Sequence, residues 1–158
     1  MDRILESLSE YGASLTYDRL SERTVHEVKR RVIDTLGCAM GSYHMRPPQI
    51  ARAHALETTG NPGATVLGTR HRSAPELAAF TNGVMVRYSD FNDMSVGRKA
   101  GHPSDTIPAV FAAAEYIGAD LRAAILGIVL AYEVQDRVGD VCEPAIDGGL
   151  DYVVYTNF

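Results

Sequence analysis

Apolar residues recur at steps of three and four along most of the chain, and this spacing limits the fold more than any other feature of the sequence. Such steps place apolar side chains on one face of an α-helix, where they can pack against a neighbouring helix. The spacing extends over residues 2–15, 22–40, 47–58, 74–88, 106–117 and 121–138. The sequence therefore predicts a mainly α fold, in which several helices form one bundle-like domain over residues 1–158.

Residues that begin or end helices lie at the borders of these segments. Ser21 and Asp120 are expected N-caps, since their side-chain oxygens can accept hydrogen bonds from the free N–H groups of a first helical turn. Ser104 or Asp105 is expected to cap the helix that follows them, and Gly118 is expected to end it.

The helical spacing is interrupted between residues 60 and 73. Residues 61–63 (Asn-Pro-Gly) form a turn sequence, and residues 64–67 are a short run with β propensity. We therefore expect a short β-strand or hairpin near residues 64–72, laid against the helices.

Composition and charge argue against several classes of partner. The net charge is −5 and the isoelectric point is near 5.5, so the chain lacks the basic surface that nucleic acids need. The longest apolar run, residues 123–132, is about half of the ~20 residues that span a membrane. Asp2, Arg3 and Glu6 stand where a signal peptide needs an apolar run. We predict a cytoplasmic protein that binds neither nucleic acid nor membrane.

No metal or cofactor site is predicted. Cys38 and Cys142 lie far apart and match no metal or redox spacing, which favours two buried, reduced thiols. The chain also contains no glycine-rich phosphate-binding motif and no G-x-S-x-G elbow. We therefore expect neither a metal nor a cofactor.

A polar stretch over residues 90–105 connects two apolar segments and holds the candidate site. Polar groups rarely crowd such a connection unless water or a function occupies them. The stretch contains carboxylates, an imidazole, cations, an amide and hydroxyls, carried by Asp90, Asn92, Asp93, Arg98, Lys99, His102, Ser104 and Asp105.

His102 is the group in this stretch that can exchange a proton near neutral pH. A carboxylate from Asp90 or Asp93 would orient the ring and form a general acid–base pair with it. The helix N-terminus after Pro103 offers N–H groups to an anion, and Lys99 adds positive charge. These features favour a carboxylate substrate that loses a proton or water. The alternative is a solvated loop whose polar residues only cap helices.

Residues 88–93 (Tyr-Ser-Asp-Phe-Asn-Asp) and 101–105 (Gly-His-Pro-Ser-Asp) closely resemble the signature of the MmgE/PrpD family. The resemblance extends along almost the whole chain, to the segments 31–37, 64–68, 131–137 and 149–153. It implies a large helical domain with a smaller lid domain, usually in a homodimer, and an activity that needs no metal.

The resemblance also implies a reaction and its residues. The implied enzyme is a 2-methylcitrate dehydratase-like lyase of propionate catabolism, which removes water from a citrate-like tricarboxylate. Other family activities are the decarboxylation of cis-aconitate and the epimerisation of iminodisuccinate, so the expected substrate is a tri- or dicarboxylate. Asp90 and His102 match catalytic positions of the family. Substrate binding is expected for Asn92, Asp93, Lys99, Ser104 and Tyr152.

Three features depart from the family pattern. Met94 stands where the family commonly has a threonine, and Tyr152 stands where the related run has a histidine. Family members are also several times longer, and the lysines expected to bind substrate would lie beyond Phe158. The chain therefore resembles the N-terminal part of the helical domain, without the lid. A helical module that binds or dimerises without catalysis is the alternative function.

Self-association is the first testable prediction. If the chain forms only part of a larger helical domain, apolar helix faces stay uncovered and should drive association between copies. Light scattering at micromolar concentration should give a mass above that of a monomer. A clean monomer under these conditions would contradict the prediction.

Overall fold

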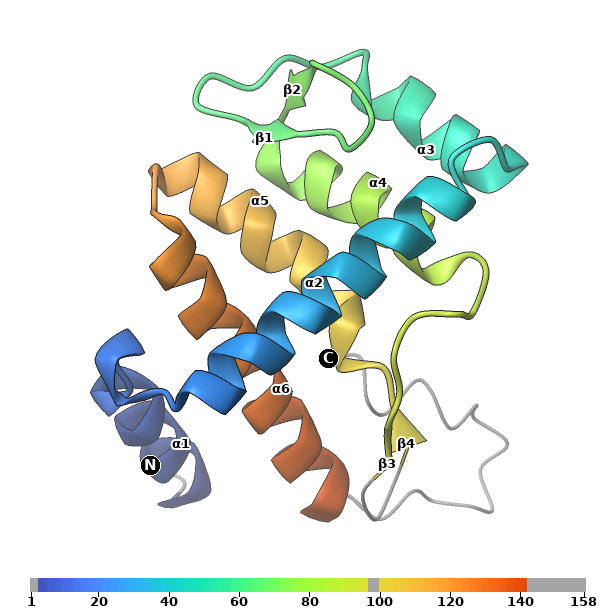
Figure 1. The fold of residues 1–158 in the computed structure, drawn as a ribbon. Coiled ribbons are helices and arrows are strands. Elements are labelled where there is room, and N and C mark those ends of the chain that lie inside the picture. The colour runs from blue at the N-terminus through green and yellow to red at the C-terminus, as the bar shows by residue number, and fades with distance from the viewer. Residues whose placement is uncertain (1–2, 97–99, 142–158) are drawn as a thin grey trace.

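Six α-helices make up most of the computed structural model, which describes residues 3–96 and 100–141 (Figure 1). They are α1 (Arg3–Ser14), α2 (Glu22–Gly41), α3 (Arg46–Ala55), α4 (Pro75–Arg87), α5 (Ile107–Ile117) and α6 (Leu121–Val141). Two short 3₁₀ helices, η1 (Tyr17–Arg19) and η2 (Pro103–Thr106), lie just ahead of α2 and α5. The predicted mainly α fold is confirmed.

Three of the predicted helix ends are confirmed in atomic detail. The Ser21 hydroxyl accepts a hydrogen bond from the Thr24 N–H at 3.1 Å, at the start of α2. Asp120 Oδ1 accepts one from the Ala123 N–H at 2.9 Å, in the first turn of α6. Gly118 ends α5 in the left-handed conformation with φ 66°, which glycine adopts without steric cost.

The predicted cap of α5 is wrong. Ser104 and Asp105 do not precede a helical turn but lie inside one, because η2 begins at Pro103 and leads directly into α5. Proline has no N–H to leave unpaired and a fixed φ suited to a first turn, so the turn starts there. Thr106 is the residue at the N-cap position of α5, and its side chain makes no capping hydrogen bond.

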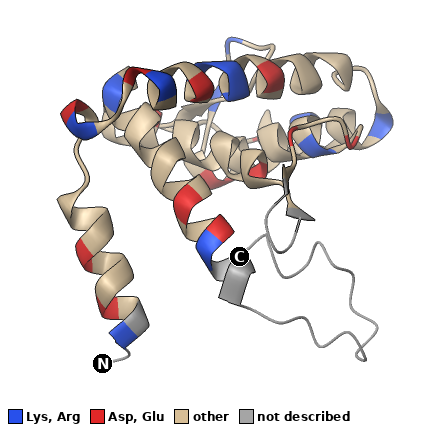
Figure 2. Cartoon of the chain, turned by 60° about the horizontal axis from the view of Figure 1, so that its bottom comes forward, with Lys and Arg blue, Asp and Glu red and all other residues tan. Residues whose placement is uncertain are grey.

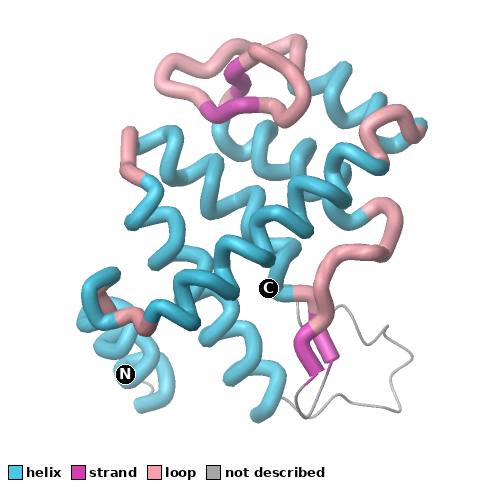
Figure 3. Tube along the Cα trace, in the orientation of Figure 1, coloured by secondary structure: helices cyan, strands magenta, loops and turns pink. Residues whose placement is uncertain are grey.

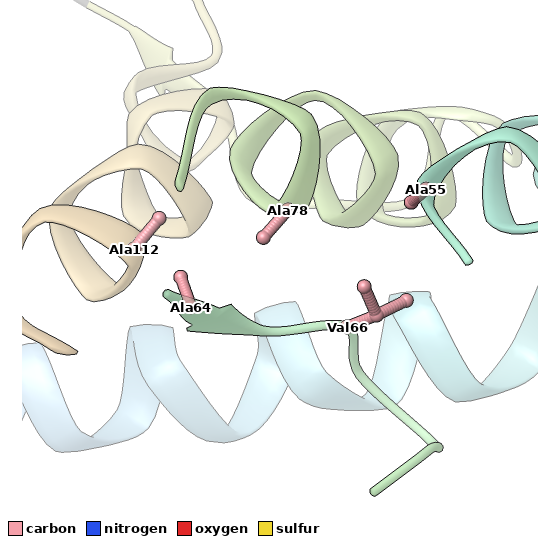
Figure 4. Packing of buried hydrophobic residues seen from close by; sticks show 5 residues of the cluster. All are labelled: Ala55, Ala64, Val66, Ala78 and Ala112. Atoms are coloured by element: carbon pink, nitrogen blue, oxygen red, sulfur yellow. The ribbon is translucent and has the colours of Figure 1, made fainter. Parts of the chain in front are cut away.

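The predicted hairpin is confirmed, and it rests on the helices. Strand β1 (Ala64–Thr65) pairs antiparallel with β2 (Arg72–Ser73), so that Ala64 lies opposite Ser73. Small side chains let the hairpin lie close to α3, α4 and α5. Figure 4 shows this packing, in which the buried residues are Ala55, Ala64, Val66, Ala78 and Ala112.

A second hairpin lies within the polar stretch and was not expected. Strand β3 (Ser95–Val96) pairs antiparallel with β4 (Ala100–Gly101), and Ser95 lies opposite Gly101. Figure 3 shows the two hairpins at opposite ends of the helical body. The second one turns the chain back, so that the residues after α4 and those before α5 lie beside each other.

One hydrophobic core is formed by α2, α5 and α6. Val28, Ile107, Ile128 and Val129 are buried together there. In Figure 1, α2 crosses over α5 and α6. The helices α2 and α6 therefore contribute both to this apolar core and to the surroundings of Asp93 in the candidate site.

The surface of the helical body is mixed in charge and partly apolar. Figure 2 shows Lys and Arg interspersed with Asp and Glu along α2. Ile33 and Met40 on α2 are 70% and 64% exposed, and Leu121 at the start of α6 is 74% exposed. Cys38 is a free, partly buried thiol, and Cys142 lies outside the described residues. Within residues 3–96 and 100–141, no helix is both long and apolar enough to cross a membrane.

Replacing Ile128 by alanine tests the core between α2, α5 and α6. Ile128 is 1% exposed, so Ile128→Ala should leave a cavity and lower the free energy of unfolding by about 2–5 kcal/mol. Ile33→Ala is the matched control on the surface and should change it by less than about 0.5 kcal/mol. Urea unfolding followed by circular dichroism measures both, and equal effects would contradict the described core.

Candidate functional site

Asp90 is the first residue of the candidate site and lies three residues after the end of α4. It has φ 54°, a left-handed conformation that aspartate tolerates better than most residues. The turn brings its carboxylate back onto Arg87, with which it forms an ion pair. This side chain is 70% exposed, and the Arg87 guanidinium holds the pKa of Asp90 below its usual value. Asp90 is therefore an ionised carboxylate on the exposed side of the polar stretch.

His102 lies between the two aspartates that sequence reasoning offered as its partners. Its Nε2 atom is 3.9 Å from Asp90 Oδ1, and its Nδ1 atom is 3.0 Å from the main-chain oxygen of Asp93. The side chain is only 14% exposed. The structure thus brings Asp90 and His102 together. The main-chain oxygen of Asp93 holds the imidazole at Nδ1, on the side away from Asp90.

Asp93 is the buried counterpart of Asp90. Its side chain is 7% exposed, and its carboxylate forms an ion pair with Arg31, whose Nη1 atom lies 2.8 Å away. The Tyr132 hydroxyl lies 3.1 Å and 3.0 Å from the two carboxylate oxygens. The Asp93 N–H donates to Asp34 Oδ2 at 3.2 Å. Residues from α2 and α6 therefore both hold this point of the polar stretch.

Burial and charge perturb the groups around Asp93. Burial, and then the charge of Asp93, raises the pKa of the Tyr132 phenol, which therefore stays protonated as a donor. Burial also raises the pKa of the Cys38 thiol, with the charges of Asp34 and Asp93 as further causes. Both effects favour the protonated thiol of Cys38 over the thiolate.

Asn92 connects the two sides of the stretch inside the protein. Its Nδ2 donates to Ser104 Oγ at 2.9 Å and to Asp105 Oδ1 at 2.7 Å. Asn92 is 4% exposed and Ser104 is fully buried, and Asn92 Oδ1 accepts no hydrogen bond from the described residues. Burial raises the pKa of Asp105, although Arg87 Nε lies 3.5 Å from its Oδ2 atom.

The structure thus brings five of the seven predicted site residues into one cluster, namely Asp90, Asn92, Asp93, His102 and Ser104. Lys99 and Tyr152 lie outside the described residues. The roles assigned to all seven stay predictions.

Sequence reasoning missed Arg31, Arg87 and Tyr132. Arg31 and Tyr132 belong to segments that carry the family resemblance, which was a usable signal, but nothing local placed them near Asp93. Arg87 lies three residues before Asp90, a spacing that could have suggested an ion pair.

A cavity of about 360 Å³ lies beside Asp93, lined by Arg30, Arg31, Ile33, Asp34 and Asp93. Small-molecule sites usually measure about 300–1,000 Å³, so its size suits a small ligand. A more apolar cavity of about 320 Å³ is lined in part by Thr35, Phe111 and Ala124, and His102 lines neither of these two cavities. We centre the candidate site on His102, because the groups that can exchange protons gather there. Among the described residues, no cluster of three or more His, Cys, Asp or Glu side chains could hold a metal ion.

The geometry defines a class of protein. It is a helical domain in which a polar loop brings the side chains of an aspartate and a histidine within 3.9 Å of each other. Residues 6–158 match the MmgE/PrpD N-terminal domain. Because the match covers nearly the whole sequence, the chain belongs to the MmgE/PrpD family.

Several relatives carry the name 2-methylcitrate dehydratase. The proteins from Cupriavidus necator and Salmonella typhimurium are each 28% identical to the chain over 165 residues, which is 97% of this chain and 33% of theirs. A mitochondrial 2-methylcitrate dehydratase of Yarrowia lipolytica is 28% identical over 94% of this chain and 28% of its own length. The chain spans about a third of the length of these relatives.

The ion pair of Arg87 generates a test by titration. Arg87→Gln should raise the pKa of Asp90 toward its ordinary value of 3.8 and should raise the pKa of Asp105 further, since the same cation lowers both. Carboxyl ¹³C shifts measured against pH report both groups. Because the Asp90 pKa is lowered in the folded protein, its pairing stabilises the fold above pH 3.8, and this stabilisation is lost as the pH falls.

Arg30→Gln is the matched control, because Arg30 pairs with Glu27 on α2. It should leave both pKa values unchanged. A pKa of Asp90 that stays low in Arg87→Gln would show that Arg87 is not its cause.

Proposed function

We propose that this chain carries part of the active site of a 2-methylcitrate dehydratase-like lyase. The reaction removes water from a citrate-like tricarboxylate by general acid–base catalysis. The observation that carries the proposal is the pairing of His102 with the ionised, exposed carboxylate of Asp90. The names of the relatives support the choice of substrate.

The two groups suit the two proton transfers of a dehydration. A base must remove a proton from the carbon next to a carboxylate, and an acid must protonate the hydroxyl that leaves as water. An imidazole can serve as both, and an ionised carboxylate can face the positive ring while it carries the proton. We assign both proton transfers to His102, and we assign to Asp90 the role of facing the charged ring between them.

Substrate binding completes the proposal. We assign it to Asn92, Asp93, Lys99, Ser104 and Tyr152, for a tri- or dicarboxylate ligand. We also propose a cytoplasmic homodimer that acts in propionate catabolism without a metal or cofactor. The other family activities, on cis-aconitate or iminodisuccinate, begin with chemistry at a similar carbon and are alternative reactions for the same pair.

A non-catalytic module for binding or dimerisation is the second candidate. It is favoured by Met94, which places a thioether where the family commonly has a hydroxyl. It is also favoured by the exposed apolar side chains of Ile33 and Met40 on α2. Activity measured on the purified chain separates the two candidates.

The test is turnover of 2-methylcitrate, followed by the ultraviolet absorbance of the conjugated alkene that forms. If the chain is active, His102→Asn should lower kcat by about 100- to 10,000-fold, which is the usual contribution of one general acid–base group. The same assay with cis-aconitate, following loss of the alkene signal, tests an alternative activity.

His54→Asn is the matched control, because His54 lies on α3 and its side chain is 63% exposed. It should leave turnover unchanged. Turnover in the unsubstituted chain no greater than in His102→Asn would reject catalysis by this chain and favour the second candidate.

A further inference from the structure

The contact between His102 and the main chain of Asp93 has a chemical consequence for the imidazole ring. Nδ1 of His102 lies 3.0 Å from the Asp93 oxygen. A carbonyl oxygen only accepts hydrogen bonds, so Nδ1 must carry the hydrogen. In the neutral ring, Nε2 is then the atom with the free lone pair. This atom faces the Asp90 carboxylate at 3.9 Å.

We propose that Asp93 fixes His102 as its Nδ1–H tautomer, and that Arg31, Asp34 and Tyr132 are positioning residues that act through Asp93. Nε2 is thereby the atom of His102 that takes up and returns the proton. The catalytic meaning of this assignment rests on the proposed function, whereas the tautomer itself does not.

The anchoring of Asp93 explains why its carbonyl can hold the ring. Arg31 and Asp34 of α2 contact its carboxylate and its N–H respectively, and Tyr132 of α6 contacts the carboxylate from the other side. Because residues of two helices bind both the side chain and the main chain of Asp93, the Asp93 carbonyl keeps one orientation. An imidazole on an unanchored loop has no such fixed acceptor, so both of its neutral tautomers are populated in contact with water.

The tautomer gives the proton transfers a defined route. Nε2 accepts the proton as the substrate C–H bond breaks, and the electron pair of that bond forms the alkene as the C–O bond breaks. The leaving hydroxide then takes the proton from Nε2 as water, which returns the ring to its neutral state. Nδ1 keeps its hydrogen and its contact with Asp93 throughout. Asp90 faces the positive ring while Nε2 carries the proton.

Nitrogen NMR of the ¹⁵N-labelled chain tests the tautomer without any turnover. At a pH where the ring is neutral, we expect a pyrrole-type shift for Nδ1 and a pyridine-type shift for Nε2 of His102. His102→Asn identifies these signals among those of the other histidines by their loss. The opposite assignment, with the hydrogen on Nε2, would overturn the proposal.

Tyr132→Phe tests the positioning role, because it removes the hydroxyl and keeps the ring. We expect His102 to lose its preference for the Nδ1–H form and to show averaged shifts at both nitrogens. Tyr116→Phe, at an exposed tyrosine of α5, is the matched control and should leave the signals unchanged. Unchanged His102 signals in a folded Tyr132→Phe chain would reject positioning by Tyr132.

Asp34→Ala gives a second variant that does not depend on a buried position. Asp34 is exposed on α2, so its loss should not prevent folding, and it removes the acceptor of the Asp93 N–H. We expect the same shift toward averaged signals, and unchanged signals would reject the anchoring. An inactive chain with the expected tautomer would reject the proposed function alone, whereas an active chain with the Nε2–H tautomer would reject this proposal alone.

Discussion

The contact of Asp93 with Arg31 and Tyr132 is the interaction on which the site depends. It attaches the polar stretch to α2 through Arg31 and to α6 through Tyr132. Asp93 is buried while Arg31 is 39% exposed, and the ion pair contributes little net stability, because desolvation of the carboxylate offsets the attraction. The value of this contact lies in geometry. It fixes where the chain runs between two helices, and thereby where the imidazole of His102 stands.

The two aspartates of the stretch have opposite environments, although they are three residues apart. The Asp90 side chain is 70% exposed, while that of Asp93 is 7% exposed and engaged on several sides. His102 contacts the first through its carboxylate and the second through its main chain. One carboxylate is therefore open to solvent, while the other is enclosed by its partners on α2 and α6.

The helices and many of their ends were predictable, because a period of 3.6 residues and a capping side chain are local properties. Ser21, Gly118 and Asp120 act as expected for that reason. The polar stretch was also recognisable, since its composition contrasts with its apolar neighbours. The prediction that Ser104 or Asp105 caps α5 was wrong, because the turn already begins at Pro103, whose fixed φ suits a first helical turn.

The remaining features depend on tertiary contacts that no local pattern encodes. Arg31 and Tyr132 come from helices far from Asp93 in the sequence, and only the packed fold brings them to one carboxylate. The hairpin of β3 and β4 has strands of two residues, too short for an alternating pattern to be visible.

The left-handed backbone of Asp90 limits how its chemistry can be examined. At φ 54°, a residue with a Cβ atom costs about 1–2 kcal/mol, and only glycine, asparagine and aspartate adopt this conformation readily. An alanine there would remove the charge and also strain the turn that aims the chain at Arg87 and His102. Asparagine keeps the shape and the turn while it removes the charge. Because of this backbone conformation, the replacement of Asp90 by asparagine, and not by alanine, reports on the electrostatic role of Asp90 alone.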